Sequence, residues 1–499
     1  MQYLAGFNGD VIPWARATAQ VGWLNNTNGT LAYVHPGMKN GVIPGGTGER
    51  MIFRPEQHSP TITAMQSRGT LSQWQKHVAR PCVGNPILVG VFCLPFAGPL
   101  LKAARTETGG IHLYGRSSRG KTTAAQVAAS VFGCGADPSD APEQAYMQRW
   151  NITTNALEGL AAAHNDGLLV LDEIHTCNTK DFGRVVYNLA GGRGKAAFDK
   201  DRSLRPQRTW RALILSTGEI SSRQKIEESG AKARAGQLLR LIDLSTGDEI
   251  IREAHGASST DFVYGLKQVC GTYYGTAGPA FIEKLALGFR TEYALQGYVG
   301  AELDRWTNDL TPPNASPEQR RGLRRLALAG VAGALARELG VLPFDEGEIK
   351  EAISVLADLW HLDSAQVPDN VRGLQAIQGF MQRHAARFRG AMDNGTSTIR
   401  DLAGYTTADC YLFTPEGLQE ACGGFDSGEV AKELDRRGLL FKNDPGRLQS
   451  KHTICFAGTH KRLRLFAVRH TVLEKDFLRE TQPSTDPGTN GTSGADAAT

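Results

Sequence analysis

Short apolar runs alternate with helical patterns through the middle of this chain. The runs GGIHLY, GLLVLD, ALILST and LLRLIDL each have the length of a buried strand and are rich in Leu, Ile and Val. Strands that alternate with helices indicate a parallel sheet covered by helices. Between the first two runs there is room for one further strand, which includes YMQRW. The pattern therefore predicts an α/β domain over residues 69–275.

The pattern changes on both sides of this α/β domain. Residues 1–68 are rich in Gly, Asn, Thr and Pro and contain brief β-prone runs, which predicts a small β-rich region. Residues 276–392 contain successive amphipathic helices, which we interpret as a helical lid. Residues 393–478 contain a helix followed by β-prone runs on either side of a turn, which is the order of a winged helix. The polar residues 479–499 are expected to be disordered.

A phosphate-binding motif follows the first apolar run. The sequence GRSSRGKTT places Gly115, Gly120, Lys121 and Thr122 at the positions of the pattern G-x-x-x-x-G-K-[ST]. Glycines let the backbone N–H groups of a loop approach a polyphosphate, the lysine reaches its β and γ phosphates, and the hydroxyl holds Mg²⁺. A strand before the loop and a helix after it are the context that this motif needs. The motif therefore predicts a site for ATP and Mg²⁺.

Two acidic residues end the second apolar run, about fifty residues after Lys121. In a parallel sheet, Asp172 and Glu173 come to the same edge as the phosphate loop. Asp172 is expected to hold Mg²⁺ together with Thr122, and Glu173 to activate the attacking water as a general base. The alternative is a pair of solvated acids that cap a strand. The predicted nucleotide-binding residues are Gly115, Arg116, Ser117, Ser118, Arg119, Gly120, Lys121, Thr122, Thr123 and Asp172.

Two further regions offer contacts to the γ-phosphate. Ser216 and Thr217 end the third apolar run, where a polar residue can sense the γ-phosphate and orient the attacking water. The alternative for either residue is a cap for the helix that follows. Arg324 and Arg325 lie on the first long helix of the predicted lid. They either reach back to the γ-phosphate or belong to a solvated basic face.

The fourth apolar run carries an arginine, which is unfavourable on a strand that enters a core unless it pairs or reaches a neighbouring subunit. An arginine finger stabilises the charge that develops on the transferring phosphate. We take Arg240 as the first candidate for this role. Arg234, which lies just upstream in KARAGQ, is the second.

Composition narrows the class of protein. The 499 residues are 41% hydrophobic and 21% charged, as in ordinary soluble proteins, and they are too many for a single core. No apolar run approaches the length of a membrane span, and the first residues lack the apolar segment of a signal peptide. The eight cysteines are scattered without the spacing of zinc ligands, which indicates reduced core residues in a cytoplasmic protein.

The net charge of +4 is small, so any surface for nucleic acid must be local. Residues 436–470 contain nine Lys or Arg and one acid, and phosphate contact is the expected use of such a stretch on a winged helix. A solvated basic surface is the alternative. Residues 191–210 are basic and longer than a tight connection needs, which predicts a β-hairpin or else a basic surface loop. The predicted DNA-binding residues are Lys195, Lys200 at the hairpin tip, Arg202, Arg436, Arg437, Lys461 and Arg462.

This succession of motifs resembles the ATPase family described as domain of unknown function 927. The family occurs in replication and helicase-like proteins of prophages, integrative elements and staphylococcal cassettes. The segments GIHLYGRSSRGKTT, NALEGLAAAHNDGLLVLDE, TWRALILSTGE and RAGQLLRLIDL carry the resemblance over roughly residues 69–245. The core of the family is similar to AAA+ helicases of the MCM type, which implies a P-loop AAA+ ATPase, a ring and movement along DNA. By this resemblance, Arg240 falls at the position of the MCM-type finger arginine.

The sequence therefore predicts an ATP-dependent DNA helicase or translocase, expected to be hexameric, that serves replication of a phage or mobile element. One alternative is a superfamily 2 helicase, because DEIH resembles a DExH box. That class needs a second RecA-like domain, whereas residues 280–475 predict helices and a winged helix. The other alternative is a regulatory switch ATPase that loads or remodels a protein partner without unwinding DNA. Stimulation of ATP hydrolysis by DNA separates this alternative from a motor.

Overall fold

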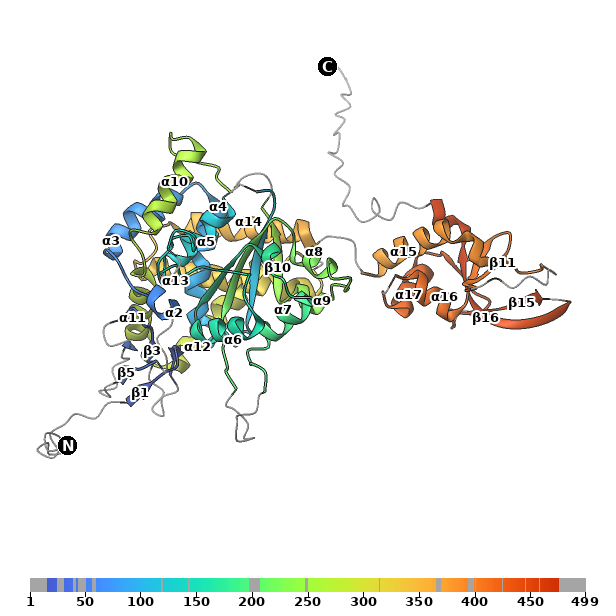
Figure 1. Ribbon diagram of the computed structural model, residues 1–499, viewed down its shortest axis with the longest axis horizontal. Helices are drawn as coiled ribbons and strands as arrows, with labels where there is room; N and C mark the ends of the chain where they lie inside the picture. Colours follow the sequence, from blue (N-terminus) through green and yellow to red (C-terminus); the bar gives the residue numbers. More distant parts are fainter. Residues whose placement is uncertain are drawn as a thin grey trace, which may run out of the picture. The chain divides into compact units, whose positions relative to one another are not determined.

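The structure is a computed structural model, and it divides the chain into two compact units, Met1–Ser364 and Ala365–Thr499 (Figure 1). Ser118, Arg119, Lys200 and Arg202 of the predicted sites, and the tail 479–499, lie outside the described residues. No helix in the described part of the chain is long and apolar enough to cross a membrane. The structure describes residues 16–24, 31–38, 42–43, 51–55, 60–117, 120–141, 144–196, 207–246, 250–313, 315–364, 369–393, 399, 401–423, 425–444, 446–456 and 458–474.

A five-stranded parallel sheet forms the centre of the first unit, as the sequence predicts. Its order is β10-β6-β9-β8-β7, and every neighbouring pair is parallel. The strand predicted from YMQRW is β7, which follows β6 in the chain but lies at the edge of the sheet beside β8. In the sheet, β9 separates the loop strand from the acidic strand. The strands are β6 (Gly109–Tyr114), β7 (Gln148–Arg149), β8 (Leu168–Asp172), β9 (Leu213–Gly218) and β10 (Leu241–Ser245).

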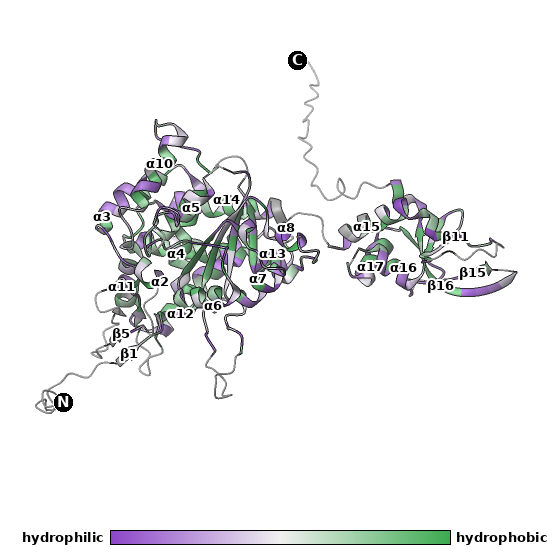
Figure 2. Cartoon of the chain, viewed as in Figure 1, coloured by the Kyte–Doolittle hydropathy of each residue, from purple (hydrophilic) through white to green (hydrophobic). Residues whose placement is uncertain are grey.

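Apolar residues hold the sheet between layers of helices. All residues of β8 and β9 are buried, and these strands are hydrophobic up to the polar residues at their carboxyl ends (Figure 2). Helix α4 is buried at every position and packs against α5. All eight cysteines of the chain are buried, as the sequence predicts. The helices of this part are α4 (Pro86–Ala97), α5 (Lys121–Ala129), α6 (Thr154–Ala163), α7 (Phe182–Ala190), α8 (Ser222–Glu227) and α9 (Ala235–Leu238).

The described parts of the N-terminal region contain short strands and pack onto the α/β core. The indole N–H of Trp23 donates to the Pro99 carbonyl at 2.7 Å, and the Tyr33 hydroxyl donates to the Asp166 carbonyl at 2.8 Å. β1 pairs in parallel with β5, while β2, β3 and β4 form an antiparallel sheet. The elements are β1 (Arg16–Thr18), β2 (Gly22–Trp23), β3 (Tyr33–Val34), β4 (Val42–Ile43), β5 (Met51–Phe53), α2 (Pro60–Ala64) and α3 (Leu71–Trp74).

The helices after residue 276 do not form the predicted lid. α13 and α14 pack against α4, and their apolar residues belong to the main hydrophobic core of the first unit. Of the described residues that line the cavity at the phosphate loop, none comes from α11 to α14. Their apolar faces are therefore used to cover the core. The helices are α10 (Ser259–Cys270), α11 (Ala277–Phe289), α12 (Glu292–Leu310), α13 (Pro317–Glu338) and α14 (Glu346–Ser364).

The second unit combines helices with a mixed sheet and begins earlier than predicted. Val371, Leu374 and Ile377 of α15 join the core of the second unit, so the boundary lies near residue 365 instead of residue 393. Helices precede a hairpin, in which β15 runs antiparallel to β16. The elements are α15 (Asp369–Arg383), β11 (Phe388–Gly390), β12 (Gly404–Thr406), β13 (Cys410–Phe413), α16 (Pro415–Ala421), α17 (Ser427–Arg436), β14 (Leu440–Phe441), β15 (Ser450–Phe456) and β16 (Thr459–Arg469).

Candidate nucleotide-binding and hydrolysis site

The loop between β6 and α5 has the backbone conformation that its glycines allow. Gly115 and Gly120 have φ angles of 148° and 94°, in the region that L side chains rarely adopt. Gly120 is the N-cap of α5, so the free N–H groups of this helix face the loop. The Lys121 ammonium donates to the carbonyls of Gly115 at 2.8 Å and Arg116 at 2.6 Å. The lysine thus lies across the loop, and burial lowers its pKa.

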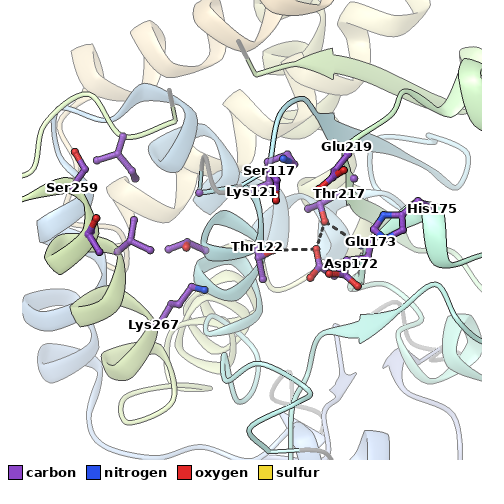
Figure 3. Close-up of a pocket in the computed structure, with 16 residues that line it drawn as sticks. Ser117, Lys121, Thr122, Asp172, Glu173, His175, Thr217, Glu219, Ser259 and Lys267 are labelled. Carbon is purple, nitrogen blue, oxygen red and sulfur yellow. Dashed lines mark hydrogen bonds between the residues drawn. The ribbon is translucent and has the colours of Figure 1, made fainter. Parts of the chain in front are cut away.

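The two residues predicted to hold Mg²⁺ come together at the end of β8 (Figure 3). The Thr122 hydroxyl lies 3.5 Å from the Asp172 carboxylate, and the Thr217 hydroxyl donates to the same carboxylate oxygen. Asp172 is 2% exposed, and this burial raises the pKa of its carboxyl, whereas the hydrogen bond from Thr217 lowers it. Hydroxyl and carboxylate oxygens are the ligands that Mg²⁺ prefers. The donor set therefore fits the predicted ion.

Glu173 pairs with an arginine that the sequence analysis missed. Arg149 on β7 donates to the Glu173 carboxylate at 3.1 Å and to the Asp137 carboxylate at 3.2 Å. The Arg149 and Glu173 side chains are 37% and 36% exposed, so the net energy of their ion pair is small. Glu173 has a φ of 60°, which is uncommon for a residue other than glycine and indicates a constrained backbone. The only sequence signal for this contact was the arginine of YMQRW, next to the acidic strand in the sheet.

A cavity of about 510 Å³ lies against the phosphate loop. Its volume is within the range of roughly 300–1,000 Å³ that is usual for small-molecule sites. Helix α10 forms the side opposite Asp172, and Ser259 and Lys267 of this helix are separated from the carboxylates by the cavity (Figure 3). Helix α10 is not predicted to be in the site, because nothing in its sequence signals contact with a nucleotide. The described lining residues are Ser117, Gly120, Lys121, Thr122, Thr123, Asp172, Glu173, His175, Thr217, Gly218, Glu219, Ile251, Ser259, Thr260, Val263 and Lys267.

The two polar residues at the end of β9 face opposite sides of the sheet, because side chains alternate along a strand. Thr217 lines the cavity, and the Glu173 N–H lies 3.4 Å from its hydroxyl. Ser216 is fully buried, 2.8 Å from His112 Nδ1, and accepts a hydrogen bond from the Trp150 indole at 2.9 Å. The next helix is capped by another residue, Ser221. Thr217 therefore remains a candidate, whereas the prediction for Ser216 is contradicted.

Arg240 precedes β10, because the predicted fourth strand divides into α9 and β10. The Gly110 N–H donates to the Arg240 carbonyl at 2.7 Å, which places Arg240 at the start of β6, whereas the phosphate loop follows the end of β6. Gly115 follows five residues later, about 17 Å along an extended strand. An arginine side chain does not span that distance. The Arg240 guanidinium instead lies 4.5 Å from the ring of Tyr187, and Arg234 is exposed at the N-cap of α9.

Arg325 anchors the turn before β10 and does not reach the cavity. Its guanidinium donates to the Leu239 carbonyl at 2.6 Å, and a Cβ at Gly109 would lie 2.3 Å from it. Arg325 is 8% exposed, and burial lowers its pKa to about 10. Arg324 pairs with Asp304 at 2.7 Å. The predicted contact of these arginines with the γ-phosphate of their own chain is therefore wrong, and Arg325 is not part of a solvated face.

The predicted basic hairpin of the first unit is described at its base only. The Gly194 N–H donates to the Arg208 carbonyl at 2.9 Å, so the two arms run antiparallel where they leave the core. Lys195 is exposed on the first arm. Lys200 and Arg202, which the hairpin prediction places near the tip, lie outside the described residues.

The predicted DNA-binding residues of the second unit differ in their availability. Lys461 and Arg462 are exposed on β16. Arg436 and Arg437, at the end of α17, both donate to the Glu433 carboxylate, at 2.6 and 2.7 Å. Hydrogen bonds from Arg436 and Arg437 lower the pKa of Glu433 to about 2, although burial opposes them. Arg437 is 17% exposed and is held by this pair, which makes it less available for DNA than Lys461 and Arg462.

Comparison with known proteins supports the expected resemblance. Residues 1–209 match the family described as Domain of unknown function (DUF927), a span that includes the phosphate loop and the acidic strand. A solved structure described as "SCCmec type IV Cch - active helicase" is similar to the chain with a TM-score of 0.67 and 17% identity, over 93% of this chain and 82% of that one. No curated protein matches the chain. The chain therefore contains a domain of unknown function 927 over residues 1–209, and its fold is similar to that of the Cch helicase.

Proposed function

We propose that the protein is a P-loop ATPase of the AAA+ type with a C-terminal winged helix, and that it acts as a DNA helicase or translocase. One observation carries the ATPase assignment. Lys121, Thr122, Asp172 and Glu173 meet at one edge of a parallel sheet whose strands, numbered in chain order, follow the order 5-1-4-3-2. The phosphate loop lies at the carboxyl end of its strand, where ligands bind in open α/β sheets. The cavity beside it accommodates a nucleotide.

Each residue of the site would have a separate role in ATP hydrolysis. Lys121 would exchange the carbonyls of its own loop for the β and γ phosphates of ATP. Thr122 and Asp172 would hold Mg²⁺, which would screen the charge of the phosphates. Glu173 would take the proton from the attacking water after leaving Arg149, and Thr217 would orient that water.

If Arg240 is the finger arginine, its position supports a ring of subunits. The residue lies at the edge of the sheet opposite its own phosphate loop, so it can stabilise transition-state charge only on a nucleotide of a neighbouring subunit. Such a contact joins two different faces, and a heterologous interface of this kind closes into a ring when its rotation allows. We take the ring to be a hexamer.

DNA is the proposed track of this motor. The likeness to a structure described as an active helicase supports the assignment, and the mobile-element cassette in that description supports a role in replication of such an element. The antiparallel base of the basic hairpin supports a phosphate-contacting arm at the first unit. We propose Lys195, Lys200 and Arg202 as residues that contact DNA phosphate.

The test is ATP hydrolysis and strand separation measured on one preparation. Phosphate release should rise when DNA is added, and a forked duplex should be unwound in the presence of ATP and Mg²⁺. A fully active ATPase that ignores DNA would refute the motor and favour a switch ATPase acting on a protein partner. The Arg149–Glu173 pair is compatible with that second function, because a restrained general base suits an enzyme that waits for a partner.

A further inference from the structure

The hairpin formed by β15 and β16 concentrates positive charge. Residues 450–469 contain five Lys or Arg and no Asp or Glu. All five of these cations are exposed: Lys451, Lys461, Arg462, Arg464 and Arg469, the last of which lies over the Phe441 ring. The ion pairs between described residues of the second unit use other side chains. Exposed cations with no acid among them indicate a surface for an external anion.

Three of these cations lie on one face of the hairpin. Lys451 is directly opposite Arg464, and Thr453 is directly opposite Arg462. Arg462 and Arg464 are two residues apart on β16, so they point to the same side with about 7 Å between them along the strand. Like charges directly opposite each other destabilise an antiparallel pair. A row of cations that is present despite this destabilisation indicates a surface that binds a row of anions on another molecule.

Helix α17, which precedes the hairpin, has the opposite character. Its cations Lys432 and Arg436 pair with Glu429 at 2.8 Å and Glu433 at 2.6 Å, and Asp435 adds a further acid. In helix-turn-helix proteins, the second helix of the motif enters the major groove. A helix with more acids than bases, whose cations are already paired, is poorly suited to DNA phosphates. Within the second unit, the distribution of charge therefore favours the β15–β16 hairpin over α17 as the surface that contacts DNA phosphates.

We propose that the β15–β16 hairpin, and not α17, holds the phosphate backbone of duplex DNA, an inference that rests on the proposed function as a DNA motor. A two-stranded β-ribbon fits the major groove of B-form DNA, whereas the A-form major groove is too narrow for side chains to read. Single strands are bound largely by stacking on aromatic side chains. The cationic face presents Lys451, Thr453, Arg462 and Arg464 together with His460, and among the described residues it has no exposed Phe, Tyr or Trp. The hairpin extends beyond the helices of its unit (Figure 1).

The test compares two full-length variants of equal charge change. One carries Arg462→Gln and Arg464→Gln on the hairpin, and the control carries Lys432→Gln and Arg436→Gln on α17. Binding of a labelled duplex is measured by fluorescence anisotropy over a range of salt concentrations. Loss of two phosphate contacts should reduce the slope of log K against log salt by about 2 and weaken binding roughly 10- to 30-fold at 0.15 M salt. The control should bind as the wild type does.

Basal ATP hydrolysis should be unchanged in both variants, because neither alters the nucleotide site. A variant with Arg462→Lys and Arg464→Lys should keep most of the affinity, since phosphate contact needs charge more than shape. If the double glutamine variant does not fold, each single substitution should reduce the slope by about 1.

Two results would overturn the inference and leave the motor intact. In one, DNA stimulates the ATPase and the hairpin variant binds duplex like the wild type. In the other, the hairpin variant loses binding only to a single strand of the same length. A wild-type protein that neither binds DNA nor is stimulated by it would overturn the proposed function itself, and the hairpin inference with it.

Discussion

Arg240→Ala and Lys121→Ala proteins should each be inactive as ATPases and should regain activity when mixed. The physical reason is a distance within the subunit. Arg240 lies beside Gly110, and about 17 Å of strand separates Gly110 from Gly115 at the phosphate loop. The guanidinium of Arg240 also points away from the strand, with a hydrogen bond of 2.6 Å to the Gly236 carbonyl. An effect of Arg240 on hydrolysis must therefore be exerted on the nucleotide of a neighbouring subunit.

The expected size of the rescue follows from how such rings assemble. An interface is active only when Lys121 is intact on one side and Arg240 is intact on the other. With random assembly from equal amounts, about a quarter of the interfaces meet this condition, so the ATPase rate should reach about a quarter of the wild-type rate. The rate should fall toward zero as either variant comes to predominate. Phosphate release is measured against mixing ratio, and native mass spectrometry confirms that mixed rings have formed.

No rescue at any ratio, with mixed rings confirmed, would refute the assignment of Arg240. The same series with Arg234→Ala then tests the second candidate, which is exposed at the N-cap of α9. Full wild-type activity of the Arg240→Ala protein alone would show that Arg240 is not an arginine finger, either for its own subunit or for a neighbouring one. The matched control is Arg324→Ala, an arginine that pairs with Asp304 outside the site and should leave hydrolysis unchanged.

Glu173→Gln should keep ATP binding and lower turnover by roughly 10²-fold, because the general base is lost, whereas Lys121→Ala should lose binding of a fluorescent ATP analogue. Arg149→Ala should raise basal ATPase by up to about five-fold, since an ion pair this exposed contributes at most about 1 kcal/mol, and a decrease would show that Arg149 assists catalysis. Lys200→Ala should leave basal ATPase and oligomerisation intact and abolish DNA-stimulated ATPase and unwinding. An unchanged unwinding rate would remove the predicted basic hairpin of residues 191–210 from the mechanism. Burial raises the pKa of Asp243 to about 6, so the folded state binds this proton more tightly than the unfolded chain does, and stability should fall as pH rises from about 4 to 6. Thermal melts should show a smaller decrease over this range for Asp243→Asn.

The sequence by itself determined the parts of the site that depend on neighbours in the chain. Gly115, Gly120, Lys121 and Thr122 lie within eight residues, between a strand and a helix that their own pattern predicts. The backbone of such a loop depends on local dihedral freedom, which glycine supplies. Asp172 could be placed as well, because parallel strands that alternate with helices bring their carboxyl ends to one edge of the sheet.

Tertiary structure alone decided which polar groups face one another. Arg149 meets Glu173 because β7 pairs with β8 at the edge of the sheet, and Ser216 is excluded because its face of β9 packs against Trp150. Arg325 lies 86 residues from the carbonyl it holds. A sequence pattern shows which side chains a helix or strand carries and which of them share a face. The partner of each group, and whether a cation is paired or available, depends on packing between elements whose order in space differs from their order in the chain.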